Sequence, residues 1–135
     1  MTENEIAIRA RQVADKIENL WNVIKSPADS EQRADRIRSD TTEILCDVST
    51  AYSWLEMRDA TAADRLMRRL CHFCDRANAS VNLPKGDHRV AELCPMALKT
   101  AESVRSLADL IEADQPDAVA KGDDTKDDTP KKNAG

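Results

Sequence analysis

The sequence predicts an all-α protein, an up-and-down antiparallel bundle of four long helices over residues 1–113, followed by a disordered charged tail over 114–135. The chain of 135 residues suits one domain and holds only 3 Gly and 5 Pro, so few residues interrupt a helix. Four stretches repeat apolar residues at spacings of three and four, the period of a bundle seam. The tail has no such period.

The first helix is expected over residues 3–25. Its seam consists of Ile6, Ala10, Val13, Ile17, Leu20 and Ile24. Trp21 lies beside this seam and should cover its edge. Ser26 and Pro27 then provide a capping residue and a proline at the first helical position, and together they predict the start of the next helix.

The second helix is expected over residues 27–58. Its seam consists of Ala34, Ile37, Thr41, Ile44, Val48, Ala51 and Leu55. Within it, the segment from Asp40 to Glu43 matches a capping box, a pattern that is typical of a helix start. A break of this helix near residue 40 is therefore the alternative.

The third helix is expected over residues 61–81. Its seam consists of Ala63, Leu66, Leu70, Cys74, Ala77 and Val81. No Gly or Pro separates it from the second helix, and the apolar phase slips by one residue at Asp59 and Ala60. A tight turn and one long helix with a stutter both fit that slip.

Residues 82–87 predict a turn, because they combine Pro84, Gly86 and a capping Asp87. A fourth helix is expected from Asp87 to Ala113. Its seam consists of Val90, Cys94, Ala97, Ala101, Val104, Ala108 and Ile111. Pro95 would kink this helix because it lacks a backbone N–H, unless the helix proper begins at Pro95.

Three thiols and an imidazole lie close together in the sequence and could supply the four ligands of a zinc ion. These residues are Cys71, Cys74, His88 and Cys94. Zinc takes such ligands tetrahedrally, and a C-x-x-C pair supplies two of them from one turn. The competing interpretation, which we prefer, is structural: Cys74 falls on the core seam, where a cysteine acts as a small hydrophobe. We therefore expect no metal or other cofactor.

The third helix also carries a cationic stripe, opposite its apolar seam. The stripe consists of Arg65, Arg68, Arg69, His72 and Arg76. Lys85, His88 and Arg89 follow the turn and could extend it. The guanidinium group of arginine binds phosphate and carboxylate well, so the stripe indicates a small anionic ligand as one interpretation. The interpretation that we prefer is a solvated charged face, paired with Asp64, Asp75 and acids of a neighbouring helix. The stripe has no aromatic residue on which bases could stack, and this disfavours nucleic acid.

A second face of the second helix carries small, weakly polar residues together with a tryptophan and a methionine. It consists of Cys46, Thr50, Ser53, Trp54 and Met57. Small residues permit another helix to approach closely, and an exposed Trp54 would leave apolar surface in water. This face therefore predicts a homo-oligomer interface.

Several functional classes are disfavoured by the sequence. Neither histidine follows a Glu by three residues, as di-iron bundles require, and there is no Gly-rich phosphate loop. No apolar run approaches the roughly 20 residues of a membrane span, and the N-terminus lacks a secretory pattern. The net charge of −5 gives no overall attraction to nucleic acid or anionic membrane. We expect a cytoplasmic protein with reduced cysteines.

These patterns together predict a non-enzymatic interaction or regulatory protein, of the accessory or inhibitor type, that contacts a protein partner through its helical faces and forms a homo-oligomer. One alternative is a binder of a small anion or nucleotide along the cationic stripe. A second alternative is a helical module stabilised by zinc.

Overall fold

A computed structural model describes residues 2–26, 30–84 and 86–114 of the chain, and within these ranges every regular element is helical. The elements are α1 (Glu3–Ile24), α2 (Ser30–Asp47), α3 (Ser49–Arg58), α4 (Ala60–Ala79), the 3-10 turn η1 (Ser80–Asn82), α5 (His88–Ala91) and α6 (Leu93–Ala113). The predicted disordered tail lies outside the described residues, except for its first residue, Asp114.

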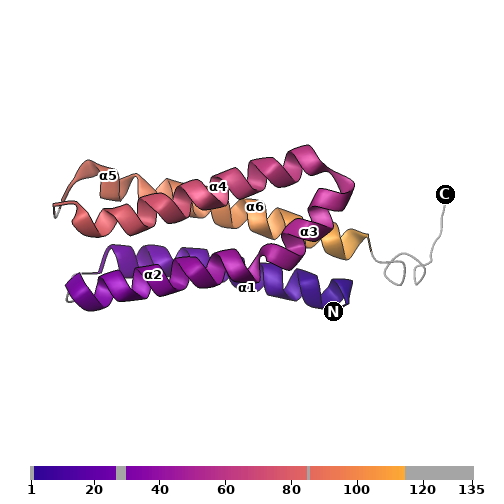
Figure 1. Ribbon diagram of the computed structural model, residues 1–135, viewed down its shortest axis with the longest axis horizontal. Coiled ribbons are helices and arrows are strands. Elements are labelled where there is room, and N and C mark those ends of the chain that lie inside the picture. Colours follow the sequence, from indigo (N-terminus) through magenta and orange to yellow (C-terminus); the bar gives the residue numbers. More distant parts are fainter. Residues whose placement is uncertain (1, 27–29, 85, 115–135) are drawn as a thin grey trace.

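The long helices form an up-and-down antiparallel bundle, which confirms the predicted fold class (Figure 1). Helices α1, α2, α4 and α6 run alternately in opposite directions, and α3 connects the end of α2 to the start of α4. Helix α1 packs on α2 and α6, and α4 packs on α2, α3 and α6. The order α1–α2–α4–α6 therefore closes on itself around one core.

The core consists of the aliphatic residues of the predicted seams and one aromatic ring. Most seam residues of α1, α4 and α6 are buried, and Trp21 packs partly buried against them as expected. Phe73 is among the largest fully buried side chains, although it is one position away from the predicted seam residue Cys74. The seam of α4 is thus wider than one residue per turn, as is usual for a helix in a globular core.

Helices α1 and α6 share the most extensive contact in the bundle. Both contribute fully buried alanines, and such small side chains let helix backbones approach closely. Arg11 on α1 binds Glu112 of α6 through both terminal nitrogens, at 2.7 and 2.8 Å. In the opposite direction, Arg105 on α6 binds Glu18 of α1 at 2.7 and 3.1 Å. On each helix, an arginine therefore binds a carboxylate of the other helix in a bidentate manner. These two pairs fix the register of α1 against α6.

The break in the second predicted helix lies at Val48, between α2 and α3, so the alternative of a break near residue 40 is wrong. Asp40 and Glu43 do not cap a helix start, because Asp40 binds Arg36 and Glu43 binds Lys16. At Val48 the backbone hydrogen bonds continue to both sides, so the break is a bend. The Ser49 hydroxyl donates to the Cys46 carbonyl, a local bond that often bends helices.

A tight turn joins α3 to α4, so the alternative of one continuous helix is wrong. The backbone of Asp59 has φ −155° and ψ 86°, outside the helical region, and its carboxylate accepts a hydrogen bond from the Ala62 amide. Asp59 is therefore the N-cap of α4. A capping aspartate ends one helix and starts the next here without any Gly or Pro.

The single helix expected over Asp87–Ala113 is two helices in the structure. Gly86 has a positive φ of 85° in the preceding turn, and Asp87 caps the short helix α5. Glu92 separates α5 from α6, so Pro95 is the third residue of α6. No N–H in the first turn of a helix has an intrahelical partner, and the ring of Pro95 therefore removes no hydrogen bond.

We expect Phe73→Ala to lower the free energy of unfolding by about 3–5 kcal/mol, because it removes a fully buried ring and leaves a cavity. Urea denaturation followed by circular dichroism measures this change. Met57→Ala is the control, since Met57 is 84% exposed and its truncation should cost no more than about 0.5 kcal/mol. Equal costs for the two variants would contradict the assigned core.

Candidate binding groove between α4 and α6

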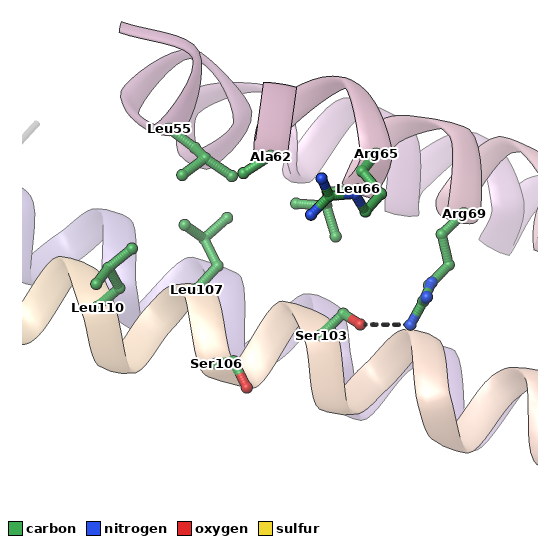
Figure 2. A pocket seen from close by; sticks show the side chains of 9 residues that line it. All are labelled: Leu55, Ala62, Arg65, Leu66, Arg69, Ser103, Ser106, Leu107 and Leu110. Carbon is green, nitrogen blue, oxygen red and sulfur yellow. Dashed lines mark hydrogen bonds between the residues drawn. The ribbon is translucent and has the colours of Figure 1, made fainter. Parts of the chain in front are cut away.

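An apolar groove runs between α4 and α6, next to the end of α3 (Figure 2). It has a volume of about 310 Å³ and is lined by Leu55, Ala62, Arg65, Leu66, Arg69, Ser103, Ser106, Leu107 and Leu110. Leu107 is 4% exposed and belongs to the core, whereas Leu110 is 52% exposed. The groove therefore has a buried apolar floor and an open apolar rim.

A cationic hollow adjoins the apolar groove along the same helix pair. It has a volume of about 580 Å³ and is lined by Arg65, Arg68, Arg69, His72, Met96, Lys99 and Thr100. Arg65 and Arg69 line both depressions, so the two form one surface. We call this combined surface the α4–α6 groove. It is apolar toward Leu110 and cationic toward Lys99.

Much of the positive charge in the cationic hollow is not neutralised by the described residues. Arg65, His72 and Lys99 form no ion pair and no side-chain hydrogen bond with them. Arg69 donates only to a neutral acceptor, the Ser103 hydroxyl, at 3.0 Å (Figure 2). Arg68 alone binds a carboxylate, that of Asp64, at 2.8 Å, and this hydrogen bond raises the pKa of the Arg68 guanidinium.

Elsewhere in the described structure, most arginines have a carboxylate partner. They are Arg11, Arg36, Arg38, Arg58, Arg76, Arg89 and Arg105. The pairs on α1 and α6 show the effect clearly: the hydrogen bond from Arg105 holds the pKa of Glu18 below its usual value. The α4–α6 groove therefore brings Arg65, Arg69 and Lys99 together on one surface without a carboxylate partner among the described residues.

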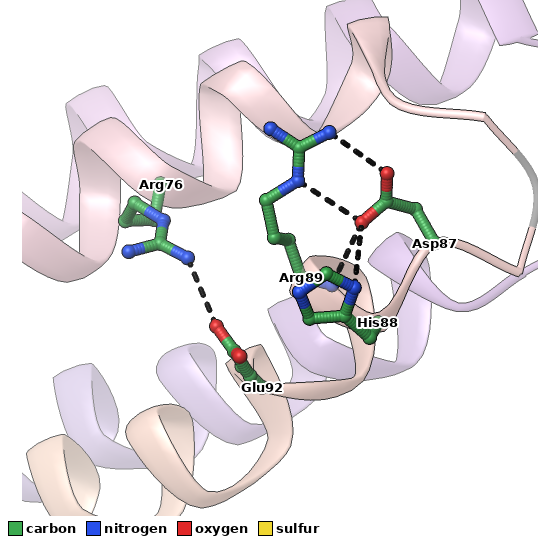
Figure 3. Close-up of polar contacts among 5 residues, drawn as sticks. All are labelled: Arg76, Asp87, His88, Arg89 and Glu92. Atoms are coloured by element: carbon green, nitrogen blue, oxygen red, sulfur yellow. Dashed lines mark hydrogen bonds and ion pairs between the residues drawn. The ribbon is translucent and has the colours of Figure 1, made fainter.

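The predicted stripe is shorter in the structure than in the sequence, because its last members bind neighbouring acids. Arg76 lies 3.3 Å from Glu92 and does not line the hollow (Figure 3). Arg89 and His88 both lie against Asp87, at 2.8 and 3.8 Å, so they do not extend the stripe. Lys85 lies outside the described residues.

The four zinc candidates do not come together. Cys71 is exposed, Cys94 is half-buried, and His88 points to Asp87. Burial of the Cys74 thiol raises its pKa to about 12, which disfavours the thiolate that a metal needs. Among the described residues, no group of three or more His, Cys, Asp or Glu is placed to hold a metal ion.

The predicted oligomer face is only partly on the surface. Cys46, Ser53 and Met57 are exposed and Thr50 is half-buried, but Trp54 is 7% exposed, so its predicted exposure is wrong. The Trp54 indole N–H donates to Glu3 of α1 at 2.9 Å. The Arg58 guanidinium covers the ring at 3.9 Å from its centroid. Trp54 therefore ties α3 to the start of α1 within one chain, and the case for an oligomer loses its main apolar contributor.

Sequence reasoning missed the contribution of α6 to the groove. Lys99, Ser103 and Leu110 follow one another at helical spacings of four and seven. That spacing identifies a shared face of α6. Which helix faces it depends on the antiparallel pairing with α4, and the spacing alone does not reveal that pairing.

A second hollow, between α1 and α2, is less suited to binding. Its charged side chains include Lys16, Arg36, Asp40 and Glu43. Lys16 binds Glu43 at 2.5 Å and Arg36 binds Asp40 at 3.1 Å. Because these charges already neutralise each other, a ligand would have to compete with internal ion pairs.

Comparison of the chain with protein-family models, curated proteins and solved structures gave no match. Within the described ranges, no helix combines the length and the apolar character required to cross a membrane.

We expect Asp87→Asn to make the stability of the protein less sensitive to acid. Hydrogen bonds from the side chain and backbone of Arg89 hold the pKa of Asp87 well below its usual value. The ionised carboxylate therefore stabilises the fold fully above the unfolded pKa of about 4, and this contribution is lost as the pH falls below it. Asn still caps a helix, so the substitution removes mainly the charge.

Thermal melting of the wild type and of Asp87→Asn, from neutral pH down to below the unfolded pKa of about 4, measures this loss of stability. The wild type should melt higher than Asp87→Asn near neutral pH, and the difference should shrink as the solution is acidified. Asp75→Asn is the control, because Asp75 is exposed and forms no ion pair or hydrogen bond with the described residues. A difference that stays constant down to low pH would refute the role of Asp87.

Proposed function

We propose that the protein is a non-enzymatic interaction protein that binds a protein partner through the α4–α6 groove. The observation that supports this proposal is the combination of an open apolar rim at Leu110 with cations that lack acidic partners. Protein interfaces combine an apolar centre with a polar and charged rim in this way. Exposed leucine and unpaired arginine both gain from a partner that covers them.

The polar groups in the groove favour binding over catalysis. The Ser103 hydroxyl donates to the Lys99 carbonyl at 3.0 Å and accepts from Arg69. Its proton is therefore directed at the backbone and not at a neighbouring base. A catalytic nucleophile needs a base within hydrogen-bond reach. The Ser103 hydroxyl instead accepts a hydrogen bond from Arg69 and holds that guanidinium in place.

Site-specific photocrosslinking tests this proposal. A photoreactive amino acid is placed at one of three exposed positions. These are Ser106 in the groove, Ser53 on the predicted oligomer face, and Ser39 on α2. We expect one discrete adduct with a protein of the native host from position 106, and none from position 39. The adduct should disappear when Leu110→Glu is introduced, since this places a charge on the apolar rim.

The same experiment can reject the proposal. Equal crosslinking from positions 39 and 106 would show that the groove is not a preferred surface. A self-adduct formed only from position 53 would favour the homo-oligomer face instead. Leu110 is already half-exposed, so Leu110→Glu should keep the fold, and thermal melting of this variant verifies that it does.

Binding of a small anion is the second candidate function. It is supported by the convergence of Arg65, Arg69 and Lys99 on one hollow. In this case tripolyphosphate should raise the melting temperature of the wild type, because a ligand that binds only the folded state stabilises it. Arg69→Ala should lose most of that rise, whereas Arg9→Ala, which removes an exposed arginine of α1, should keep it. No rise in the wild type would rule out this candidate.

A further inference from the structure

We propose that the partner presents an acidic amphipathic α-helix, which lies along the α4–α6 groove with its apolar residues over Leu110 and its carboxylates against Arg65, Arg69 and Lys99. This inference rests on the proposed function and names the kind of partner. It follows from the charge of the groove, its shape, and the order of apolar and cationic residues along it.

The charge of the groove calls for an acidic partner. Arg65 and Lys99 have no carboxylate partner among the described residues, and Arg69 has only the Ser103 hydroxyl. Like charges at neighbouring helical positions repel one another mildly, so Arg65 and Arg69 on α4 gain when carboxylates approach. Arginine matches the geometry of a carboxylate and binds it in a bidentate manner, as Arg11 and Arg105 do in this molecule.

The shape of the groove fits a helix. Two antiparallel helices, α4 and α6, form its walls, and their contact is much less extensive than that of α1 with α6 (Figures 1 and 2). A third helix can pack its side chains between those of two others. From Leu110 to Lys99 the groove follows about three turns of α6, or roughly 16 Å at the rise of an α-helix. The described chain has no sheet edge to which an extended peptide could add.

Two other anionic partners fit the groove less well. Nucleic acid would leave the apolar half unused, and no Trp, Tyr or Phe lines either depression to stack on bases. A lipid acyl chain would use the apolar half, but the rim of that half is exposed, with Leu110 at 52%. Small-molecule sites usually bury most of their ligand, so an acyl chain would remain largely in water here.

The order of residues along the groove predicts the pattern of the partner helix. Leu110 and Leu55 lie at one end, and Arg68, His72 and Lys99 lie at the other. The partner should therefore carry apolar residues at spacings of three and four over its first two turns, and acidic residues at the same spacings on the same face beyond them. A helix of the opposite direction would carry the same two blocks in reverse order.

Peptide display on the full-length protein tests this inference. A random library of peptides of about 16 residues, long enough to span the groove as a helix, is selected on the wild type. Binders that also bind Leu110→Glu are removed. We expect the enriched peptides to be helical when bound and to carry the apolar and acidic blocks. Their affinity should fall about tenfold or more on Arg69→Ala, as expected for loss of a charge-assisted hydrogen bond, and should be unchanged on Arg9→Ala.

Three outcomes would overturn the inference: enriched peptides that are extended or proline-rich, enriched peptides without acidic residues, or no enrichment above Leu110→Glu. Vesicles containing phosphatidylserine are tested in parallel. Vesicle binding that is lost in the same variants, without any enriched peptide, would assign the groove to a lipid surface. If Ser106 crosslinks to a host protein through a segment that is not an acidic helix, the proposed function stands and this inference fails.

Discussion

The packing of α1 against α6 is the constraint on which the rest of the bundle depends. These are the first and last helices of the chain, and their contact closes the ring of helices. Fully buried alanines on both helices let them approach closely. The bidentate ion pairs Arg11–Glu112 and Arg105–Glu18 define their register. Because α6 is held mainly by α1, its contact with α4 is limited, and the groove lies along that open seam.

Much of the fold could be predicted from the sequence, because bundle seams repeat locally along each helix. The seams of α1, α4 and α6 correctly predicted most of the buried residues, and the arrangement of the helices confirms the antiparallel bundle. The helix boundaries were harder to predict. Asp40 and Glu43 resemble a capping box, yet they bind Arg36 and Lys16. A carboxylate serves equally well as a cap or as an ion-pair partner, and only the tertiary structure decides between the two roles.

The candidate site could be predicted only in part, for the same physical reason. Arg65, Arg68, Arg69 and His72 lie on one face of one helix, so their spacing was sufficient to group them. Arg76 does not belong to the groove, because it forms an ion pair with Glu92, which lies just before α6. Lys99 and Leu110 belong to the groove because α6 packs against α4, and the sequence alone does not reveal this pairing. Trp54 was misplaced because its partner, Glu3, is distant in sequence.

The distribution of ion pairs gives the groove its significance. A protein with more acidic than basic residues has enough carboxylates to pair its arginines, and most described arginines are paired. Unpaired cations along one helix cost some stability, since neighbouring like charges repel. The bundle tolerates this cost because α1 and α6 hold each other independently of α4. The available charge therefore lies on a helix pair whose contact is much less extensive than that of α1 with α6, and a further helix could bind there without disturbing the core.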